Sequence, residues 1–206
     1  CCSSPLLRTG QWETSWVSAR DVAQHNVNEA EKTGANTIVT TCAGCYRTWK
    51  KDYTEEYKDL LNTNHNFKIL HTTELLEQLL KSGELKPKSS IKMRVTYHDP
   101  CHLGRHMGTY DPPRNLLKAI SGVELIEMPR ARENAWCCGS GGGVKSGYPD
   151  WAIEISGERL KEAEQLGVES IVSACPFCER NLNDAISKCG SKLKVYDVVE
   201  LVNKAF

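Results

Sequence analysis

The sequence predicts an α/β fold of two pseudo-repeated units, each a small parallel sheet of the βαβ type with helices packed on it. Stretches typical of strands and of helices alternate along the chain, which indicates parallel α/β sheets. A cysteine motif also occurs twice at similar spacing, and a repeat of this length indicates two related domains. Gly83–Ser90 is the most linker-like segment, so we expect the first unit at residues 1–86 and the second at residues 87–206.

The first unit is expected to contain two helices and two strands. In chain order these are a helix, two strands and a helix, at Glu13–Lys32, Thr37–Thr41, Phe67–His71 and Thr72–Lys81. The first helix has apolar residues every three or four positions, and the first strand is a β-branched run that leads directly into Cys42. Thr72 or Thr73 is expected to cap the last helix.

The second unit repeats this alternation. We expect strands and helices in turn at Ile91–Tyr97, Pro112–Ile120, Val123–Met128, Asp150–Leu166 and Ser170–Ser173, and a short strand and helix within Val195–Phe206. Three cysteine motifs then follow strands, beginning at Cys42, Cys101 and Cys175. Parallel sheets bind ligands at the carboxyl ends of their strands, so we expect these motifs to form the site.

The second unit contains five cysteines in the pattern C-x35-C-C-x36-C-x-x-C. They are Cys101, Cys137, Cys138, Cys175 and Cys178. Five thiols are more than a tetrahedral zinc ion needs, and soft thiolates suit a multi-iron cluster. The glycine run that follows Cys138 allows backbone to approach such a cluster without Cβ clashes.

The first unit contains a related but incomplete set. Its cysteines are Cys1, Cys2, Cys42 and Cys45, with 39 residues between Cys2 and Cys42. The chain begins at a cysteine, inside the motif and without an initiator methionine, so we expect it to be part of a longer polypeptide with a further cysteine about 35 residues upstream. Cys189 belongs to neither set, and we interpret it as a helix-end residue.

Composition limits the classes of function. Lys+Arg and Asp+Glu are 26 each, so no net field would draw the chain to nucleic acid. No apolar run reaches the roughly 18 residues of a membrane span, so we expect no direct membrane insertion. Long helical patterns fit a disulfide framework poorly, and the glycine run meets neither nucleotide-binding fingerprint. A reducing cytoplasm is the expected location.

The five-cysteine pattern resembles the cysteine-rich CCG domain of heterodisulfide reductase catalytic subunits, which belong to methanogenesis, and of glycolate-oxidase and lactate-utilisation iron–sulfur subunits. The spacing, the Cys-Cys-Gly at Cys137–Gly139 and the Cys-Pro-x-Cys at Cys175–Cys178 all agree, and the resemblance covers essentially the whole chain. The first unit departs from the pattern, because Ser3 stands where a glycine is expected and the upstream cysteine is missing.

The resemblance implies an oxidoreductase in which each unit holds a non-cubane [4Fe–4S] cluster. The two clusters would face each other across a cleft where the mixed disulfide of coenzyme M and coenzyme B is split into two thiols. The implied ligands of the second cluster are Cys101, Cys137, Cys138, Cys175 and Cys178. Those of the first are Cys1, Cys2, Cys42 and Cys45, and a fifth is absent from this sequence.

Within that family, the stretches Pro5–Gly10 and His98–Arg105 look most like the D-type subunit. That subunit carries a ferredoxin-like segment and works with a membrane cytochrome b, which implies an electron-donating partner and a position peripheral to the membrane. His98 and His102 flank Cys101, and a proton-donating role weighs equally with that of ordinary polar loop residues. Arg105 is a surface residue by default, but its guanidinium near a cluster loop could hold an anionic substrate.

Two alternatives from other classes stay open at this point. The chain could be the electron-transfer iron–sulfur subunit of a glycolate- or lactate-type 2-hydroxyacid oxidoreductase, which shares the motif. It could also be a zinc-stapled binding module with all-thiolate tetrahedral sites and no redox centre. Metal and sulfide analysis separates the zinc alternative from the other two, and the substrate separates those two from each other.

Overall fold

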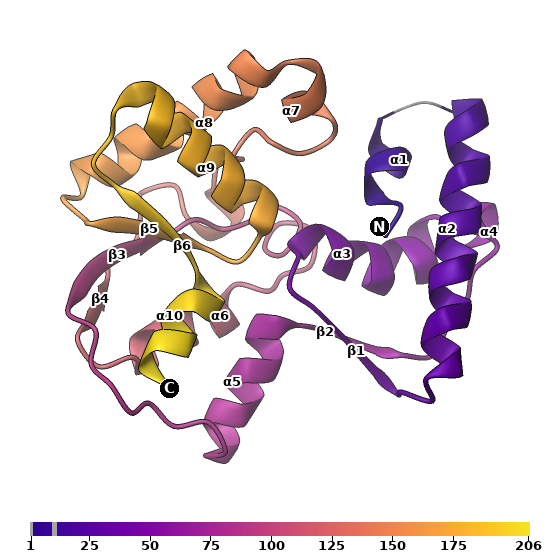
Figure 1. Ribbon diagram of the computed structural model, residues 1–206, viewed down its shortest axis with the longest axis horizontal. Coiled ribbons are helices and arrows are strands. Elements are labelled where there is room, and N and C mark those ends of the chain that lie inside the picture. Colours follow the sequence, from indigo (N-terminus) through magenta and orange to yellow (C-terminus); the bar gives the residue numbers. More distant parts are fainter. Residues whose placement is uncertain (1, 10–11) are drawn as a thin grey trace.

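Two parallel sheets form the framework of the molecule (Figure 1). The computed structural model describes residues 2–9 and 12–206, and for residues 12–18 it describes the backbone alone. The predicted ligand Cys1 therefore lies outside the described residues. Every strand pair in the described chain is parallel, so the predicted α/β class with parallel sheets is confirmed.

The first half of the chain contributes a two-stranded sheet. Its elements are α1 (Ser4–Arg8), α2 (Trp12–Lys32), β1 (Thr37–Thr40), α3 (Ala43–Arg47), η1 (Thr48–Glu56), α4 (Lys58–Leu61), β2 (Lys68–His71) and α5 (Thr72–Ser82). β1 and β2 pair from Thr37 opposite Lys68 to Thr40 opposite His71. η1 is a π-helix that directly continues α3, which the sequence does not predict. Such helices are rare and occur frequently at functional sites.

The second half contributes a four-stranded sheet in the order β4-β3-β5-β6. Its elements are β3 (Met93–Tyr97), α6 (Asp111–Ala119), β4 (Val123–Leu125), η2 (Arg132–Asn134), α7 (Val144–Gly147), α8 (Pro149–Gln165), β5 (Ser170–Ser173), α9 (Pro176–Cys189), β6 (Lys194–Asp197) and α10 (Val198–Ala205). In Figure 1, α8 and α9 cover one face of this sheet, and α6 and α10 lie on the other. In the described chain, none of the helices combines the length and apolar character needed to cross a bilayer.

The two halves are packed against each other. α5 of the first half lies beside α6 of the second (Figure 1), and the side chain of Asn115 donates a hydrogen bond to Glu77 across that contact. One buried apolar cluster includes Tyr46 and Trp49 from the first half and Val95 and Val172 from the second. Burial of apolar surface is the dominant favourable term in folding, so this shared core fixes the positions of the strand ends of both halves.

The helix that follows β2 is capped differently from the prediction. The cap is His71 rather than Thr72 or Thr73, because its ring accepts the N–H of Thr73 while Glu74 accepts the N–H of His71. The Thr72 hydroxyl instead donates to the carbonyl of Thr40, which ties the helix to β1. Asp197 and Glu200 form the same reciprocal pair at α10, so the two halves repeat each other at this level of detail.

Several predicted strands are shorter in the structure. β2 begins at Lys68 instead of Phe67, β3 at Met93 instead of Ile91, and β4 ends at Leu125 instead of Met128. At the start of β3 the reason is local, because the N–H groups of Ile91 and Met93 bond to the Ser121–Gly122 turn rather than to a strand. The predicted order of strands and helices is otherwise present.

Candidate metal centre

Three strands deliver cysteines to the same region. β1 leads to Cys42, the N-cap of α3, and β5 leads to Cys175, the N-cap of α9. β3 ends at Tyr97, and the segment from His98 to Cys101 follows it. This is the arrangement that the sequence predicts, because the carboxyl ends of parallel strands meet at one edge.

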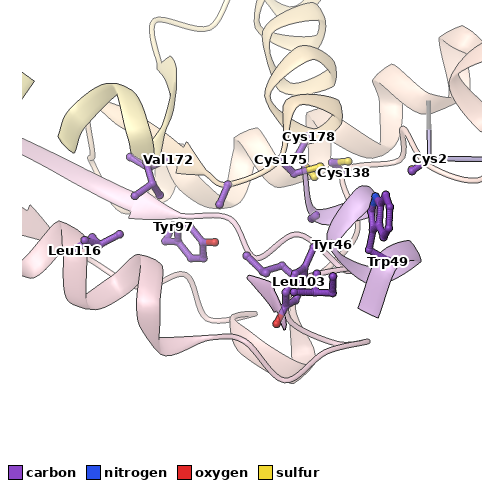
Figure 2. Packing of buried hydrophobic residues seen from close by; sticks show 14 of the residues in the cluster. Cys2, Tyr46, Trp49, Tyr97, Leu103, Leu116, Cys138, Val172, Cys175 and Cys178 are labelled. Carbon is purple, nitrogen blue, oxygen red and sulfur yellow. The ribbon is translucent and has the colours of Figure 1, made fainter. Parts of the chain in front are cut away.

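The thiols of the two cysteine sets form one continuous chain of neighbours. Consecutive members lie within hydrogen-bonding reach in the order Cys2, Cys45, Cys42, Cys175, Cys178, Cys138, Cys137 and Cys101. The two sets therefore meet at the contact between Cys42 and Cys175. Figure 2 shows the sulfur atoms of Cys138, Cys175 and Cys178 gathered beside Tyr46 and Trp49 of the first half. Cys189 ends α9 and is exposed, as predicted of a helix-end residue.

Neighbouring thiols divide thiolate character between them. Hydrogen bonds from Cys175 and Cys45 lower the pKa of Cys42, and hydrogen bonds from Cys101 and Cys138 lower that of Cys137. The backbone N–H of Gly139 also points at Cys137 Sγ, at 3.4 Å. Cys42 and Cys137 are thus held as thiolates, and the thiolate is the form that binds metal.

The glycine after the paired cysteines is required by the backbone. Gly139 has a φ of 86°, and a Cβ there would lie 2.8 Å from the carbonyl oxygen of Ala152. In the first half, Ser3 takes the corresponding place and also has a left-handed φ of 61°. The departure from the pattern at Ser3 therefore keeps the backbone conformation of the motif.

A histidine lies against the second set. His98 is 1% exposed, and its ring nitrogens lie within 4.8 Å of the sulfur atoms of Cys138 and Cys178, which themselves are that close to each other. Burial and the nearby charge of Arg159 lower the pKa of His98 to about 4. The imidazole is therefore neutral and has one N–H and one lone pair to offer.

The other histidine candidate lies where the two halves meet. A Cβ on Gly44 would be 3.6 Å from Cys42 Sγ and 3.7 Å from His102 Nδ1, so the glycine permits this close approach. His102 packs edge-to-face on His106, with ring centroids 5.0 Å apart. Burial, followed by the charge of Arg8, lowers the pKa of His102 to about 4.

Arg105 has a structural assignment in this fold. Its guanidinium donates hydrogen bonds to the carbonyl oxygens of Glu133 and Ala135, immediately before the paired cysteines. Arg105 therefore ties the loop after Cys101 to the loop before Cys137.

Two further residues support the cysteine loops, and the sequence analysis does not single them out. Arg114 is 1% exposed and donates to both carboxylate oxygens of Asp99, at 2.7 and 2.8 Å, which fixes the segment between β3 and Cys101. Asn181, fully buried on α9, donates to the carbonyl oxygens of Cys138 and Ala152, at 2.6 and 2.8 Å. The aspartate of the His-Asp-Pro-Cys stretch is a signal for the first pair, whereas nothing in the local sequence marks Asn181.

The donor set fits an iron–sulfur cofactor. Soft thiolate donors are the usual ligands of iron–sulfur clusters, and the five sulfur atoms of the second set exceed the four of a structural zinc site. Cys138, Cys175 and Cys178 are each less than 9% exposed, so a centre held there would be shielded from water. The neutral His98 adds a polar group facing the same sulfur atoms.

Comparison with known proteins places this geometry in a family. The chain is 44% identical over 205 residues to the D-type subunit of the dihydromethanophenazine:CoB–CoM heterodisulfide reductase of Methanosarcina acetivorans, covering 100% of this chain and 49% of that protein. It is 39% identical to the B-type subunit of the fumarate reductase (CoM/CoB) of Methanothermobacter marburgensis and 36% identical to the probable iron-sulfur-binding oxidoreductase FadF of Bacillus subtilis. These cover 100% and 89% of this chain, and 38% and 25% of those proteins.

The chain thus spans about half the length, or less, of these curated relatives. They are named as subunits of reductases or as iron–sulfur oxidoreductases, which agrees with the thiol-rich site. The family model for the cysteine-rich CCG domain matches residues 1–50 and 95–183, the two stretches that contain the cysteine sets. With most of its length matched, and with both sets folded against each other, this chain belongs to the CCG cysteine-rich domain family.

Proposed function

We propose that this chain is part of an iron–sulfur oxidoreductase subunit that reductively cleaves a mixed disulfide, the one formed by coenzyme M and coenzyme B. The observation that carries the proposal is the contact between Cys42 and Cys175, where the two cysteine sets meet. Two redox centres held on either side of that contact would face one another. The relationship to the D-type subunit of heterodisulfide reductase supports the choice of substrate.

The proposed ligands follow the two sets. Cys101, Cys137, Cys138, Cys175 and Cys178 would hold one non-cubane [4Fe–4S] cluster. Cys2, Cys42 and Cys45, together with Cys1 and a cysteine beyond this sequence, would hold the other. When bound, such clusters supply single electrons at sites where thiolates can also coordinate.

The reaction needs two electrons and two protons. Breaking one S–S bond adds an electron pair, and two protons then give the two free thiols, so one-electron centres on both sides of the bond suit the chemistry. His102 lies at the meeting of the halves, beside Cys42 through Gly44, and its ring is placed to hydrogen-bond a substrate sulfur there. Arg105 holds the loops on either side of the second set, and its role toward an anionic substrate stays a prediction.

The electrons would come from a partner, either a ferredoxin-like segment of the same polypeptide or a membrane-bound cytochrome b. The protein would then be peripheral to the membrane through that partner. The relatives named as subunits of larger reductases support the existence of a partner.

The decisive assay uses intact holoprotein, a reduced viologen dye as donor, and the coenzyme M–coenzyme B disulfide. Cys42→Ser and Cys175→Ser should each remove nearly all disulfide reduction, because the substrate needs both sets. Cys189→Ser changes an exposed cysteine outside the sets and serves as the matched control. Full disulfide reduction in either set variant would contradict the proposal.

A second candidate function has its own support among the relatives. The chain is 36% identical to FadF and 34% identical to the EtfAB:quinone oxidoreductase of Syntrophomonas wolfei, which are not named for a disulfide. In that case the chain would carry electrons for another oxidoreductase, of the glycolate or lactate type. A wild-type protein that passes electrons from a 2-hydroxyacid flavoprotein, but reduces no disulfide, would establish it.

A further inference from the structure

The imidazole of His98 lacks hydrogen-bond partners. Neither Nδ1 nor Nε2 has a partner among the described residues, although the residue is 1% exposed. Leaving one buried polar group unsatisfied costs about 1–3 kcal/mol. A buried histidine with two unsatisfied ring nitrogens therefore indicates a partner that this chain binds at that place.

The other buried histidines provide an internal comparison. His65 Nε2 lies 3.0 Å from the carbonyl oxygen of Trp49, and His71 Nδ1 lies 2.8 Å from the hydroxyl of Thr73. Both rings are thus held by ordinary protein hydrogen bonds. His98 differs from them in environment, because its neighbours are the sulfur atoms of Cys138 and Cys178.

The position of the ring follows from the sheet. The N–H of His98 donates to the carbonyl of Val172 at 2.8 Å, and its own carbonyl accepts from the hydroxyl of Ser173 at 3.1 Å. The next residue, Asp99, is fixed by Arg114. With the backbone held on both sides, the imidazole is directed at the sulfur pair by the fold rather than by a mobile loop.

We propose that His98 is a positioning residue that donates a ring N–H to the sulfur pair of Cys138 and Cys178 and makes the centre they hold easier to reduce. This inference rests on the proposed function, in which the second set holds an iron–sulfur cluster. A hydrogen bond to a metal-bound thiolate withdraws electron density from the sulfur, and such bonds are among the factors that set the potentials of these clusters. His98 thereby tunes the centre without touching substrate.

The test is an anaerobic redox titration of the holoprotein followed by electron paramagnetic resonance. His98→Leu removes the donor and keeps an apolar side chain in the core, and the reduction equilibrium constant should fall about tenfold, a shift of about 59 mV for one electron. His98→Asn keeps a short N–H donor and should restore most of the potential. His65→Leu, the control, removes a buried histidine bonded to backbone and should leave the potential unchanged.

A spectroscopic measurement on the unaltered site covers variants that fold poorly. With ¹⁵N-labelled histidine in a His102→Gln background, pulsed resonance should show one weak nitrogen coupling, typical of a hydrogen bond to sulfur. A strong coupling would make His98 a direct ligand, and no coupling would make it a bystander, so either result overturns the inference. Wild-type protein with zinc and no sulfide would instead defeat the proposed function itself.

Discussion

The guanidinium of Arg114 and the carboxylate of Asp99 form a two-pronged ion pair inside the protein. The side chains are 1% and 3% exposed, and the two hydrogen bonds measure 2.7 and 2.8 Å. The backbone N–H of Arg132 adds a third bond to the same carboxylate, at 2.8 Å. This pair therefore joins α6 to the segment that carries Cys101 and to the loop before Cys137.

Removing one partner of this pair should be costly. Arg114→Met leaves the charge of Asp99 buried without its partner, and breaking a buried pair in this way costs about 3–5 kcal/mol. The free energy of unfolding, from denaturant titration, should fall by that amount. Asp111→Asn breaks the exposed pair of Asp111 with Arg132 and should cost less than about 1 kcal/mol. Equal losses in the two variants would refute the structural role of the buried pair.

The two positions after the paired cysteines should respond in opposite ways to exchange. Gly139→Ser puts a Cβ 2.8 Å from the Ala152 carbonyl and onto a left-handed backbone, so it should destabilise the protein by more than about 1 kcal/mol. Ser3→Gly relieves a left-handed serine and should change stability by less than about 1 kcal/mol. Thermal unfolding of both variants measures this, and a tolerated Gly139→Ser would show that the backbone does not need the glycine.

Asp197 should make stability depend on pH. Burial raises the pKa of this carboxyl to about 6, with Glu179 and Glu200 adding to the effect, while the N–H of Val199 opposes it. Because the folded-state pKa is above the unfolded value, this contribution to stability is present at low pH and is lost as pH rises through about 6.

Asp197→Asn keeps the cap of α10 without the charge. The variant should gain stability over wild type at pH 8 and lose that advantage at pH 5. Denaturant unfolding at the two pH values checks this, with Asp111→Asn as an exposed aspartate control. An advantage that is the same at both pH values would show that the charge of Asp197 is not the cause.

The sequence predicts the order of the elements well because that information is local. The β-branched run before Cys42 and the apolar alternation before His98 both lead to strands whose ends carry cysteines. The cysteine spacing likewise anticipates which thiols gather. The cap of α5 was predicted wrongly, since Thr72 and Thr73 are ordinary caps by residue type and only the tertiary bond from Thr72 to Thr40 gives the role to His71.

What the sequence does not contain are contacts made across the two halves. The meeting of Cys42 with Cys175 and the support of Cys138 by Asn181 join residues far apart in the chain. The environment of His98 is of the same kind, since a histidine beside a cysteine motif has the same letter whether it faces water or sulfur. Such placements depend on how the sheets pack, which no local pattern specifies.

The central claim is that the second cysteine set holds an iron–sulfur cluster, and the most direct measurement is anaerobic iron, zinc and sulfide analysis of natively isolated protein. The account predicts about four irons with matching sulfide at this set. They should be lost in Cys138→Ser and retained in Cys189→Ser, because only the first of these cysteines lies among the gathered thiols. Stoichiometric zinc without sulfide in the anaerobic wild-type protein would contradict the claim.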